Sequence, residues 1–518
     1  MYWADKVADE IISSGKFRPF LVDDMFTPSG FPHIGSLRGP IVHDLIYKAL
    51  KDKNQNVRFT FVINDFDPID GLPPSMQEEF SKYMGLPLRK APSPVEGFES
   101  FAAYFADDYK NSMAALGITP EFLSSWDMYN EGKFDEAIKL ALDNADKIQD
   151  IYAEVSGSKK KDIGWLPLQV ICENCGKVGT TRVFDWDGET VSYKCEPELV
   201  KWAKGCGNEN RVSPFGGNGK LPWKVDWPSH WMVIGVTIEG AGKDHSSAGG
   251  SRDIARELVK EVFKIDEPYN LPYEFFLIGG KKMASSKGLG LKARELTELL
   301  PLELGRFLFC RADYRQQVNF DPNGTMAIPD LYDEYDRCFT EYLNNTGSDF
   351  ARAFELSHIG ELPKKEKIFL PRFRDVANYI QQPSLDIHKR YSEIKGSDLS
   401  EIEKNILDER IKYAKIWLEK FAPDDMKLTL SEKENTFKLF DEQKEFLKRV
   451  IPLIEEDSSA EDLQIKVFEL TKEMKIAPKS AFQSLYQTLI GKDFGPKAGA
   501  FIRQYDKNEV IEKIKKVV

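Results

Sequence analysis

The chain has 518 residues and a mass of 59.1 kDa, which predicts several domains because single hydrophobic cores rarely grow beyond about 300 residues. Its composition, 42% hydrophobic and 30% charged with 36 glycines and 28 prolines, excludes collagen-like, low-complexity and largely disordered chains. The formal net charge is −12, yet residues 492–518 carry seven basic against four acidic side chains. That end is therefore locally positive, either as a solvated helix face or as a contact for a polyanion.

The six cysteines are too few for a disulfide scaffold, which favours a reducing compartment and a cytoplasmic location. The first residues lack a basic patch followed by an apolar run. No stretch approaches the roughly 18 to 20 apolar residues that span a bilayer. We expect neither secretion nor membrane insertion.

The first third of the chain alternates strand and helix patterns, as α/β domains do. The apolar run 20–22 leads into turn residues at 27–32, after which apolar residues recur at helical spacing: Leu37, Ile41, Leu45 and Ala49. A second strand pattern, 57–63, has period two and ends in an acidic cluster, Asp65, Asp67 and Asp70. Functional loops of parallel sheets lie at such strand ends.

Further along, Phe134, Ile138, Leu142 and Ala145 share one face of a predicted amphipathic helix. We expect buried strands at 231–238 and 275–278, each followed by a glycine-rich loop. Beyond about residue 330 the chain looks all-α, and one long helix has apolar positions Ile402, Ile406, Ile411, Ala414 and Trp417.

The loop after the first strand contains His33, Gly35 and Ser36 directly before a helix. Backbone N–H groups at a helix start favour an anion, so the loop predicts a phosphate site. Gly35 would permit close approach of a nucleotide, and His33 could donate to a phosphate oxygen. The alternative is an ordinary turn with a capping histidine.

A second loop, at 279–288, combines glycines and hydroxyls with three lysines, Lys281, Lys282 and Lys287. Ammonium groups on a glycine-hinged loop suit a leaving polyphosphate, although such a loop alone would more simply be a solvated basic segment.

Four cysteines lie within the aromatic, glycine-rich segment 165–211. Cys172 and Cys175 form a compact C-x2-C pair, whereas Cys195 and Cys206 are separated by ten residues. Four thiolates predict a tetrahedral structural zinc site, with an irregular second half. Cys310 and Cys338 are expected to be buried or free thiols.

The pair HIG and KM-x-S-S resembles the two signatures of class I aminoacyl-tRNA synthetases, here His33–Ser36 and Lys282–Ser286. The wider strings TPSGFPHIGSLRG, INDFDPID, CENCG, LPWKVDWPSHW, GKDHSSAGGS, KKMASSKG and GKDFGPKAGAFI, in that order, resemble class I lysyl-tRNA synthetase over nearly the whole chain. Ser36 stands where many class I synthetases have the second histidine of the first signature. Ser285 stands where a lysine is common in the second signature. Lys287 is a candidate source of the missing positive charge.

The resemblance implies an α/β fold: a Rossmann-type parallel-sheet catalytic domain at 1–300, interrupted by a zinc-binding insertion at 155–222. An all-α region at 301–518 would contact the tRNA stem and the anticodon. The implied partners are tRNA(Lys), L-lysine and ATP with Mg²⁺ and a structural Zn²⁺, in a monomer that needs bound tRNA before it activates the amino acid.

The resemblance also implies site residues. The catalytic ones are His33, Lys282 and Lys287. Those that bind ATP are Gly35, Ser36, Gly242, Asp244, Met283, Ser285 and Ser286, with Asp244 on the ribose or, alternatively, capping the next helix. Those that bind lysine are Thr27, Gly30, Trp223 and His245, where the Trp223 ring would face the alkyl stem unless it is simply part of the core. Charge logic, rather than the resemblance, adds Asp65 and Asp67 at the strand end as carboxylates for the lysine ammonium.

Other functions remain open at this point. The same signatures occur in synthetases for glutamate and arginine, although Asp65 and the lack of an obvious arginine pair in the pocket loops weigh against glutamate. A tRNA-binding paralogue without activity would show a broken nucleotide site, whereas both signatures look intact. A nucleotidyltransferase of the same fold would not need the long helical region.

Overall fold

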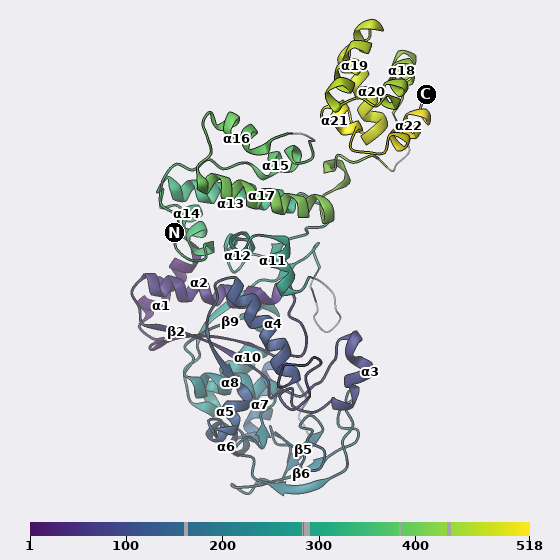
Figure 1. Cartoon of the computed structure of the whole chain (residues 1–518). Helices are drawn as coiled ribbons and strands as arrows, with labels where there is room; N and C mark the ends of the chain where they lie inside the picture. Colours follow the sequence, from purple (N-terminus) through teal and green to yellow (C-terminus); the bar gives the residue numbers. More distant parts are fainter. Residues whose placement is uncertain (160–163, 282, 284–290, 383–384, 432–436) are drawn as a thin grey trace. The chain divides into compact units, whose positions relative to one another are not determined.

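A computed structural model describes the chain from Met1 to Val518 apart from residues 160–163, 282, 284–290, 383–384 and 432–436 (Figure 1). It divides into two compact units, residues 1–321 with 337–365 and residues 322–336 with 366–518. The first unit is α/β. In the second unit every described element is helical.

The first unit is built on a five-stranded sheet with strand order β10-β9-β1-β2-β3, and every strand pair in it is parallel. The strands are β1 (Phe20–Phe26), β2 (Val57–Ile63), β3 (Glu121–Ser124), β9 (Ile238–Gly242) and β10 (Tyr269–Tyr273). The strands that follow β1 in the chain first add on one side of it, as β2 and β3, and later on the other side, as β9 and β10, so the switch point lies between β1 and β9. In such sheets ligands bind at the carboxyl ends of the strands beside this switch point.

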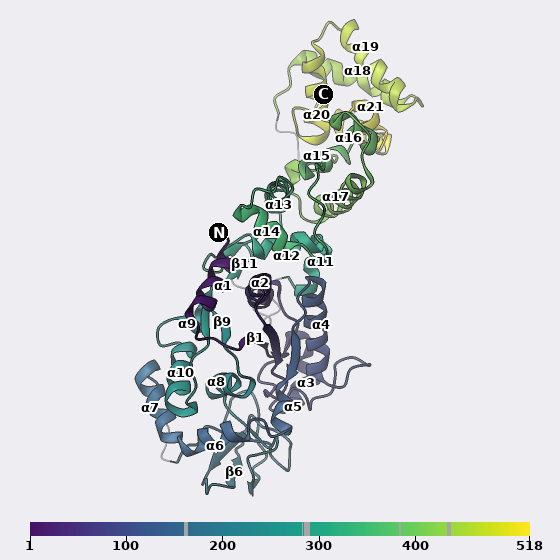
Figure 2. The same cartoon turned by 90° about the vertical axis from the view of Figure 1, so that its left-hand side faces the viewer.

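Helices cover both faces of the sheet, which explains why its strands are buried on both sides. On one face, Tyr47 of α2 (Arg38–Asp52) and Tyr109 of α4 (Phe101–Ala115) pack against Phe59 and Phe61 of β2. On the other face, Val62 belongs to the core formed with α8 (Trp223–Ile234) and α10 (Ser251–Leu258). Figure 2 shows α4 and α10 on opposite sides of β1 and β9.

The cysteine-bearing insertion lies between α7 (Ala145–Ser156) and α8, at the opposite end of the first unit from α12 (Leu302–Cys310) (Figure 1). Its root is an antiparallel pair, β4 (Gln169–Val170) with β8 (Gly219–Lys220). Beyond the root lies an antiparallel three-stranded sheet: β5 (Thr181–Phe184), β6 (Val191–Cys195) and β7 (Glu209–Val212). The apolar residues of the insertion are continuous with the core that contains α8.

The predicted strand at 231–238 is wrong in most of its length. Residues Trp231–Ile234 form the last turn of α8, which ends at Gly235 with a left-handed backbone (φ +79°), and the strand begins only at Ile238. Trp223, Trp227 and Trp231 recur every four residues along α8, where the first two rings stack and Trp231 meets Trp227 edge-on. A continuous apolar run by itself does not distinguish a buried strand from a buried helix.

The predicted strand at 275–278 is shorter than expected and lies outside the main sheet. It is reduced to β11 (Phe276–Leu277), which pairs in parallel with β12 (Val318–Asn319). The helical prediction for 37–49 is confirmed by α2, in which Ile41, Leu45 and Ala49 are buried. The predicted single helix through Phe134 and Ala145 is divided, because α6 (Asp135–Asp143) ends before Asn144 and Ala145 begins α7, although all four apolar residues are buried.

In the second unit, α17 (Glu401–Lys420) confirms the predicted long helix but not all of its apolar face. Ile402 is 48% exposed, whereas Leu407, Ala414 and Trp417 are buried. The rest of the buried face is polar, because Arg410 forms an ion pair with Asp336 and Glu403 closes a capping box. The remaining helices of this unit are α15 (Phe373–Tyr379), α16 (Ile387–Lys395), α18 (Asp441–Glu455), α19 (Ala460–Glu473), α20 (Pro478–Ile490), α21 (Ala498–Ile502) and α22 (Lys507–Lys515).

The other α-helices of the chain are α1 (Trp3–Ser14), α3 (Gln77–Phe80), α5 (Ser125–Asn130), α6 (Asp135–Asp143), α9 (Lys243–Ser246), α11 (Leu296–Leu299), α13 (Ala327–Leu343) and α14 (Asp349–Ser357). Among the helices of the described residues, none has both the length and the apolar character that crossing a bilayer requires.

Candidate active site

The first signature forms the connection between β1 and α2 at the switch point. His33 precedes a short 3-10 turn, Ile34–Leu37, and its Nδ1 accepts the N–H of Ser36 at 3.1 Å. A neutral imidazole that accepts at Nδ1 carries its proton on Nε2. Burial lowers the pKa of His33, which favours this neutral form at pH 7. The ring therefore caps the turn and presents Nε2–H as a donor, so the two alternatives for His33 are compatible.

The backbone donors of this loop are partly used within the protein. The N–H of Ile34 donates to the carbonyl of Leu291 at 2.8 Å, and the N–H of Ser36 donates to His33. An anion at this loop would therefore be met by the His33 ring rather than by these two N–H groups.

The second signature approaches the first. A methyl group on Gly35 would lie 2.8 Å from Cε of Met283 and 3.1 Å from Nδ1 of His33, so it would crowd the His33 ring and displace the end of the Met283 side chain. Directly after the signature, Lys292 pairs with His33 in an antiparallel bridge and Ala293 donates to the carbonyl of Pro32. Of the predicted residues in the second signature, Lys282, Ser285, Ser286 and Lys287 lie outside the described residues.

The predicted ribose residue lies on the neighbouring strand. Gly242 ends β9, and Asp244 follows in the first turn of α9 with its side chain exposed. A methyl group on Gly242 would lie 2.9 Å from Oδ1 of Asp244, so glycine lets the carboxylate fold back toward the strand end. This arrangement combines an accessible carboxylate with the edge at which parallel sheets bind ligands.

Two predicted lysine-binding residues come together here. Trp223 begins α8, is 40% exposed and stacks on Trp227 with ring centroids 5.3 Å apart. His245 of α9 approaches the Trp223 ring edge-on at 5.8 Å. Trp223 is therefore not a core residue, and its ring forms part of an accessible aromatic wall.

Thr27 lies one residue after β1 and donates from Oγ1 to Oδ2 of Asp67 at 2.9 Å. Oδ1 of Asp67 is 3.3 Å from Nζ of Lys220. Gly30 is buried nearby in the chain, and a methyl group on it would make only an ordinary contact with Pro73 at 3.5 Å. A larger side chain at position 30 would therefore not clash with the rest of the protein.

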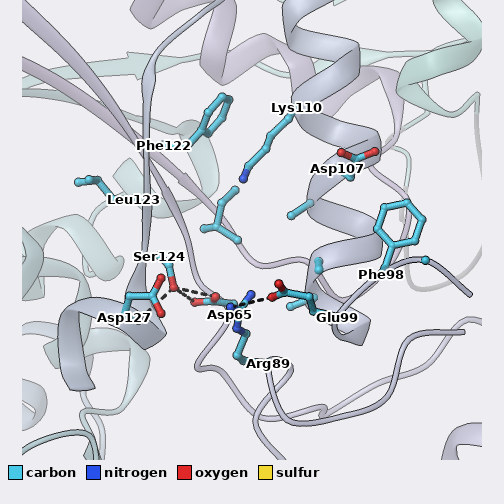
Figure 3. Close-up of a pocket in the computed structure, with 15 residues that line it drawn as sticks. Asp65, Arg89, Phe98, Glu99, Asp107, Lys110, Phe122, Leu123, Ser124 and Asp127 are labelled. Carbon is cyan, nitrogen blue, oxygen red and sulfur yellow. Dashed lines mark hydrogen bonds and ion pairs between the residues drawn. The ribbon is translucent and has the colours of Figure 1, made fainter. Parts of the chain in front are cut away.

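Asp65 is engaged elsewhere. Its carboxylate accepts hydrogen bonds from the hydroxyls of Ser124 and Ser125 and from the N–H of Trp126 at 2.8 Å, and burial raises its pKa. It lines a cavity of about 420 Å³ beside the Arg89–Glu99 ion pair (Figure 3). None of the other predicted lysine-binding residues lines this cavity. Asp65 joins the end of β2 to the start of α5, and its role in binding lysine stays a prediction.

A buried charged cluster joins two residues of the quoted strings, Asp67 of INDFDPID and Asp226 of LPWKVDWPSHW, to Lys220, which lies outside them. Lys220 at the end of β8 contacts Asp226 of α8 at 2.6 Å as well as Asp67. The only sequence signal was the presence of charged residues inside the otherwise apolar string GKLPWKVDW.

The four predicted zinc ligands converge. Their Sγ atoms all lie within 4.8 Å of one another, with Cys172 and Cys206 at 3.6 Å and Cys175 and Cys195 at 3.7 Å. Four sulfurs around a tetrahedral zinc at 2.3 Å are about 3.8 Å apart, so the donor set fits the ion. The chain turns back tightly before Cys206, since a methyl group on Gly205 would lie 2.3 Å from the carbonyl of Glu196. None of the six cysteines, all of which lie among the described residues, forms a disulfide, and Cys310 and Cys338 are buried.

Comparison with known proteins places these features in a family. The sequence profile described as tRNA synthetases class I (K) matches residues 1–360. The chain belongs to this family. Relatives of the class I (K) family that are similar along 99% of this chain and of their own length include lysine–tRNA ligases of Archaeoglobus fulgidus and Methanocaldococcus jannaschii, each 33% identical, and of Pyrococcus horikoshii, 32% identical.

A crystal structure of a glutamate tRNA ligase from Elizabethkingia meningosepticum aligns with a TM-score of 0.41 and 12% identity, covering 96% of this chain and 99% of that one. The family resemblance indicated by the motifs is confirmed by the profile and by the full-length relatives.

The contact at Gly35 generates a test. Gly35→Ala places a methyl group against Met283 and His33, and overpacking of this kind typically costs 1–3 kcal/mol. We expect kcat/KM for ATP in amino-acid activation to fall by about tenfold or more, with the fold intact by circular dichroism. Gly71→Ala is the matched control, because nothing lies within 4 Å of its added methyl group. Equal activity of both variants would contradict the close approach of the two signatures.

Proposed function

We propose that the protein is a lysine–tRNA ligase, which activates lysine with ATP to lysyl-adenylate and pyrophosphate and transfers the lysyl group to tRNA(Lys). The observation that carries the proposal is the contact of the first signature with Met283 and with residues 291–293 at the carboxyl edge of the sheet. The lysine–tRNA ligases of similar sequence support the choice of amino acid.

In the first step, a carboxylate oxygen of lysine attacks the α-phosphorus of ATP as the bond to pyrophosphate breaks. Negative charge grows on the phosphate oxygens, and the Nε2–H of His33 donates to them. Lys282 and Lys287 would stabilise the leaving pyrophosphate, and Mg²⁺ accompanies the ATP. In the second step, the terminal ribose hydroxyl of the tRNA attacks the lysyl carbonyl and AMP leaves.

The nucleotide would lie along the first signature and the end of β9. Gly35, Ser36 and Met283 would border its phosphates, together with Ser285 and Ser286. Asp244 would accept from the ribose hydroxyls, with Gly242 providing room for the ribose to approach.

The lysine would lie between Thr27 and Gly30 on one side and the Trp223–His245 wall on the other. The stacked indole of Trp223 offers an apolar face for the alkyl stem of the substrate, with an additional attraction for its ammonium.

The helical region 301–518 would bind the tRNA stem and anticodon beyond the catalytic domain 1–300. The excess of basic residues over 492–518 supports contact with a polyanion, because phosphate neutralisation depends on local charge. A monomeric state and a cytoplasmic location stay predictions.

We assign a structural zinc to the four cysteines of the insertion 155–222. Their sulfur separations fit a closed tetrahedral site, in which the ion would hold the turn between β6 and β7.

The substrate is tested by ATP–pyrophosphate exchange with each of the twenty amino acids, with and without total tRNA. We expect exchange with lysine alone, and only when tRNA is present. Exchange with glutamate or arginine would keep the reaction class and reject the lysine assignment. Absence of exchange under all conditions would favour a non-catalytic tRNA-binding protein.

The role of His33 is tested by His33→Ala. Loss of one preorganised donor to the transition state should lower the rate of adenylate formation by about 10²-fold, with little effect on lysine binding. Lys139→Ala removes an exposed side chain that is paired with Asp143 on α6 in the first unit and should leave the rate unchanged. An unchanged rate in His33→Ala would remove this side chain from the mechanism.

The zinc assignment predicts about one zinc per chain by elemental analysis of the purified protein. Cys172→Ser should lower the zinc content and destabilise the insertion, because the bound ion contributes directly to folding. Cys338→Ser replaces a buried thiol outside the cluster and should retain the zinc. Full zinc content in Cys172→Ser would reject the four-thiolate site.

A further inference from the structure

A buried ion cluster lies next to Thr27, one of the residues proposed to bind lysine. Nζ of Lys220 lies 2.6 Å from Oδ2 of Asp226 and 3.3 Å from Oδ1 of Asp67, and it also contacts the carbonyl of Leu221 at 3.3 Å. The side chains of Lys220 and Asp226 are each 2% exposed, whereas that of Asp67 is 25% exposed. Asp67 is therefore the member of the cluster that reaches the surface.

The cluster carries an unbalanced charge. Tyr129 donates its hydroxyl proton to Asp226, and its phenol stays neutral because burial raises its pKa well above the usual range. His230 packs beside Asp226, and burial lowers the pKa of its imidazole, so it adds no positive charge at pH 7. Two carboxylates and one ammonium leave a net charge of about −1.

The negative charge without a partner in the cluster has the lowest free-energy cost on Asp67, the most exposed carboxylate of the three residues. A buried charge without a counter-ion costs several kcal/mol, and Asp226 is already surrounded by Lys220 and Tyr129. Asp67 has the partially exposed carboxylate, so a cation from outside can approach it. An ammonium group of the proposed substrate has the required charge.

The cluster also joins the two walls of the pocket. Asp67 accepts the hydroxyl of Thr27, on the β1 side, at 2.9 Å. Lys220 lies three residues before Trp223, on the α8 side, and its backbone is held by pairing of β8 with Gln169 of β4. The position of the Lys220 ammonium thus affects the carboxylate of Asp67 and, through it, the hydroxyl of Thr27.

We propose that Lys220 is a positioning residue of the amino-acid pocket, which holds the carboxylate of Asp67, and through it Thr27, where it receives an ammonium group of the substrate. This inference rests on the proposed function as a lysine–tRNA ligase. It assigns the recognition of the substrate ammonium to Asp67, as positioned by Lys220. Lys220 is not a catalytic residue, because it acts on the substrate through Asp67.

The test compares steady-state constants of the full-length chain in lysine activation with tRNA present. Lys220→Met keeps the length of the side chain and removes its charge. We expect KM for lysine to rise at least about tenfold, the scale of one charge-assisted hydrogen bond, while KM for ATP stays within about twofold. Asp67→Asn, which can still accept from Thr27, should raise KM for lysine by a similar factor.

A double variant separates positioning from folding. Lys220→Met with Asp226→Asn restores the net charge of the cluster and removes the buried unpaired carboxylate at position 226, so stability should recover relative to Lys220→Met alone. Because Asp67 still lacks its ammonium partner, KM for lysine should stay high. Recovery of the wild-type KM in the double variant would show a merely structural role and overturn the proposal.

The matched control is Lys194→Met, which removes the same charge from an exposed ion pair with Glu209 in the same insertion and should change neither constant. If the unaltered protein does not activate lysine, the proposed function fails first. If it activates lysine and Asp67→Asn has the wild-type KM, only the present inference fails. Should Lys220→Met not fold, Asp67→Asn and the double variant still decide the outcome.

Discussion

The backbone pairing of residues 32–34 with residues 291–293 is the constraint on which the active site depends. It attaches the segment after the second signature to the loop that leaves the central strand β1. Met283 also approaches this loop, since its Cε lies 2.8 Å from where a methyl group on Gly35 would stand. Segments far apart in the chain are thereby held together beside the switch point.

A second set of interactions fixes the wall formed by α8. The carboxylate of Glu239 on β9 accepts the indole N–H groups of Trp227 and Trp231, and the guanidinium of Arg252 lies over the Trp231 ring at 4.4 Å. Burial raises the pKa of Glu239 to about 7, so these donors and the nearby guanidinium are what support its charged form. With α8 anchored at two indoles, the third, Trp223, is left exposed beside His245.

The insertion contributes more than a metal site. Its root strands return the chain to the sheet with Lys220 at the last position of β8, next to the start of α8. The cysteine cluster and Lys220 therefore belong to one continuous segment, whose apolar residues are part of the main core. Through Lys220 this segment also contacts Asp67 and Asp226, which lie outside it.

The sequence by itself determined the α/β class, the two signatures and the four cysteines that the fold brings together, because these depend on local periodicity and on residue types at characteristic spacing. Only the tertiary structure decided that residues 231–234 are helical, that Asp65 is satisfied by Ser124 and Ser125, and that Asp67 contacts Thr27 and Lys220. The reason is physical: an apolar run is compatible with helix or strand until its packing partners are known. Likewise, a carboxylate is available to a substrate only if donors from other elements of the fold have not already bound it.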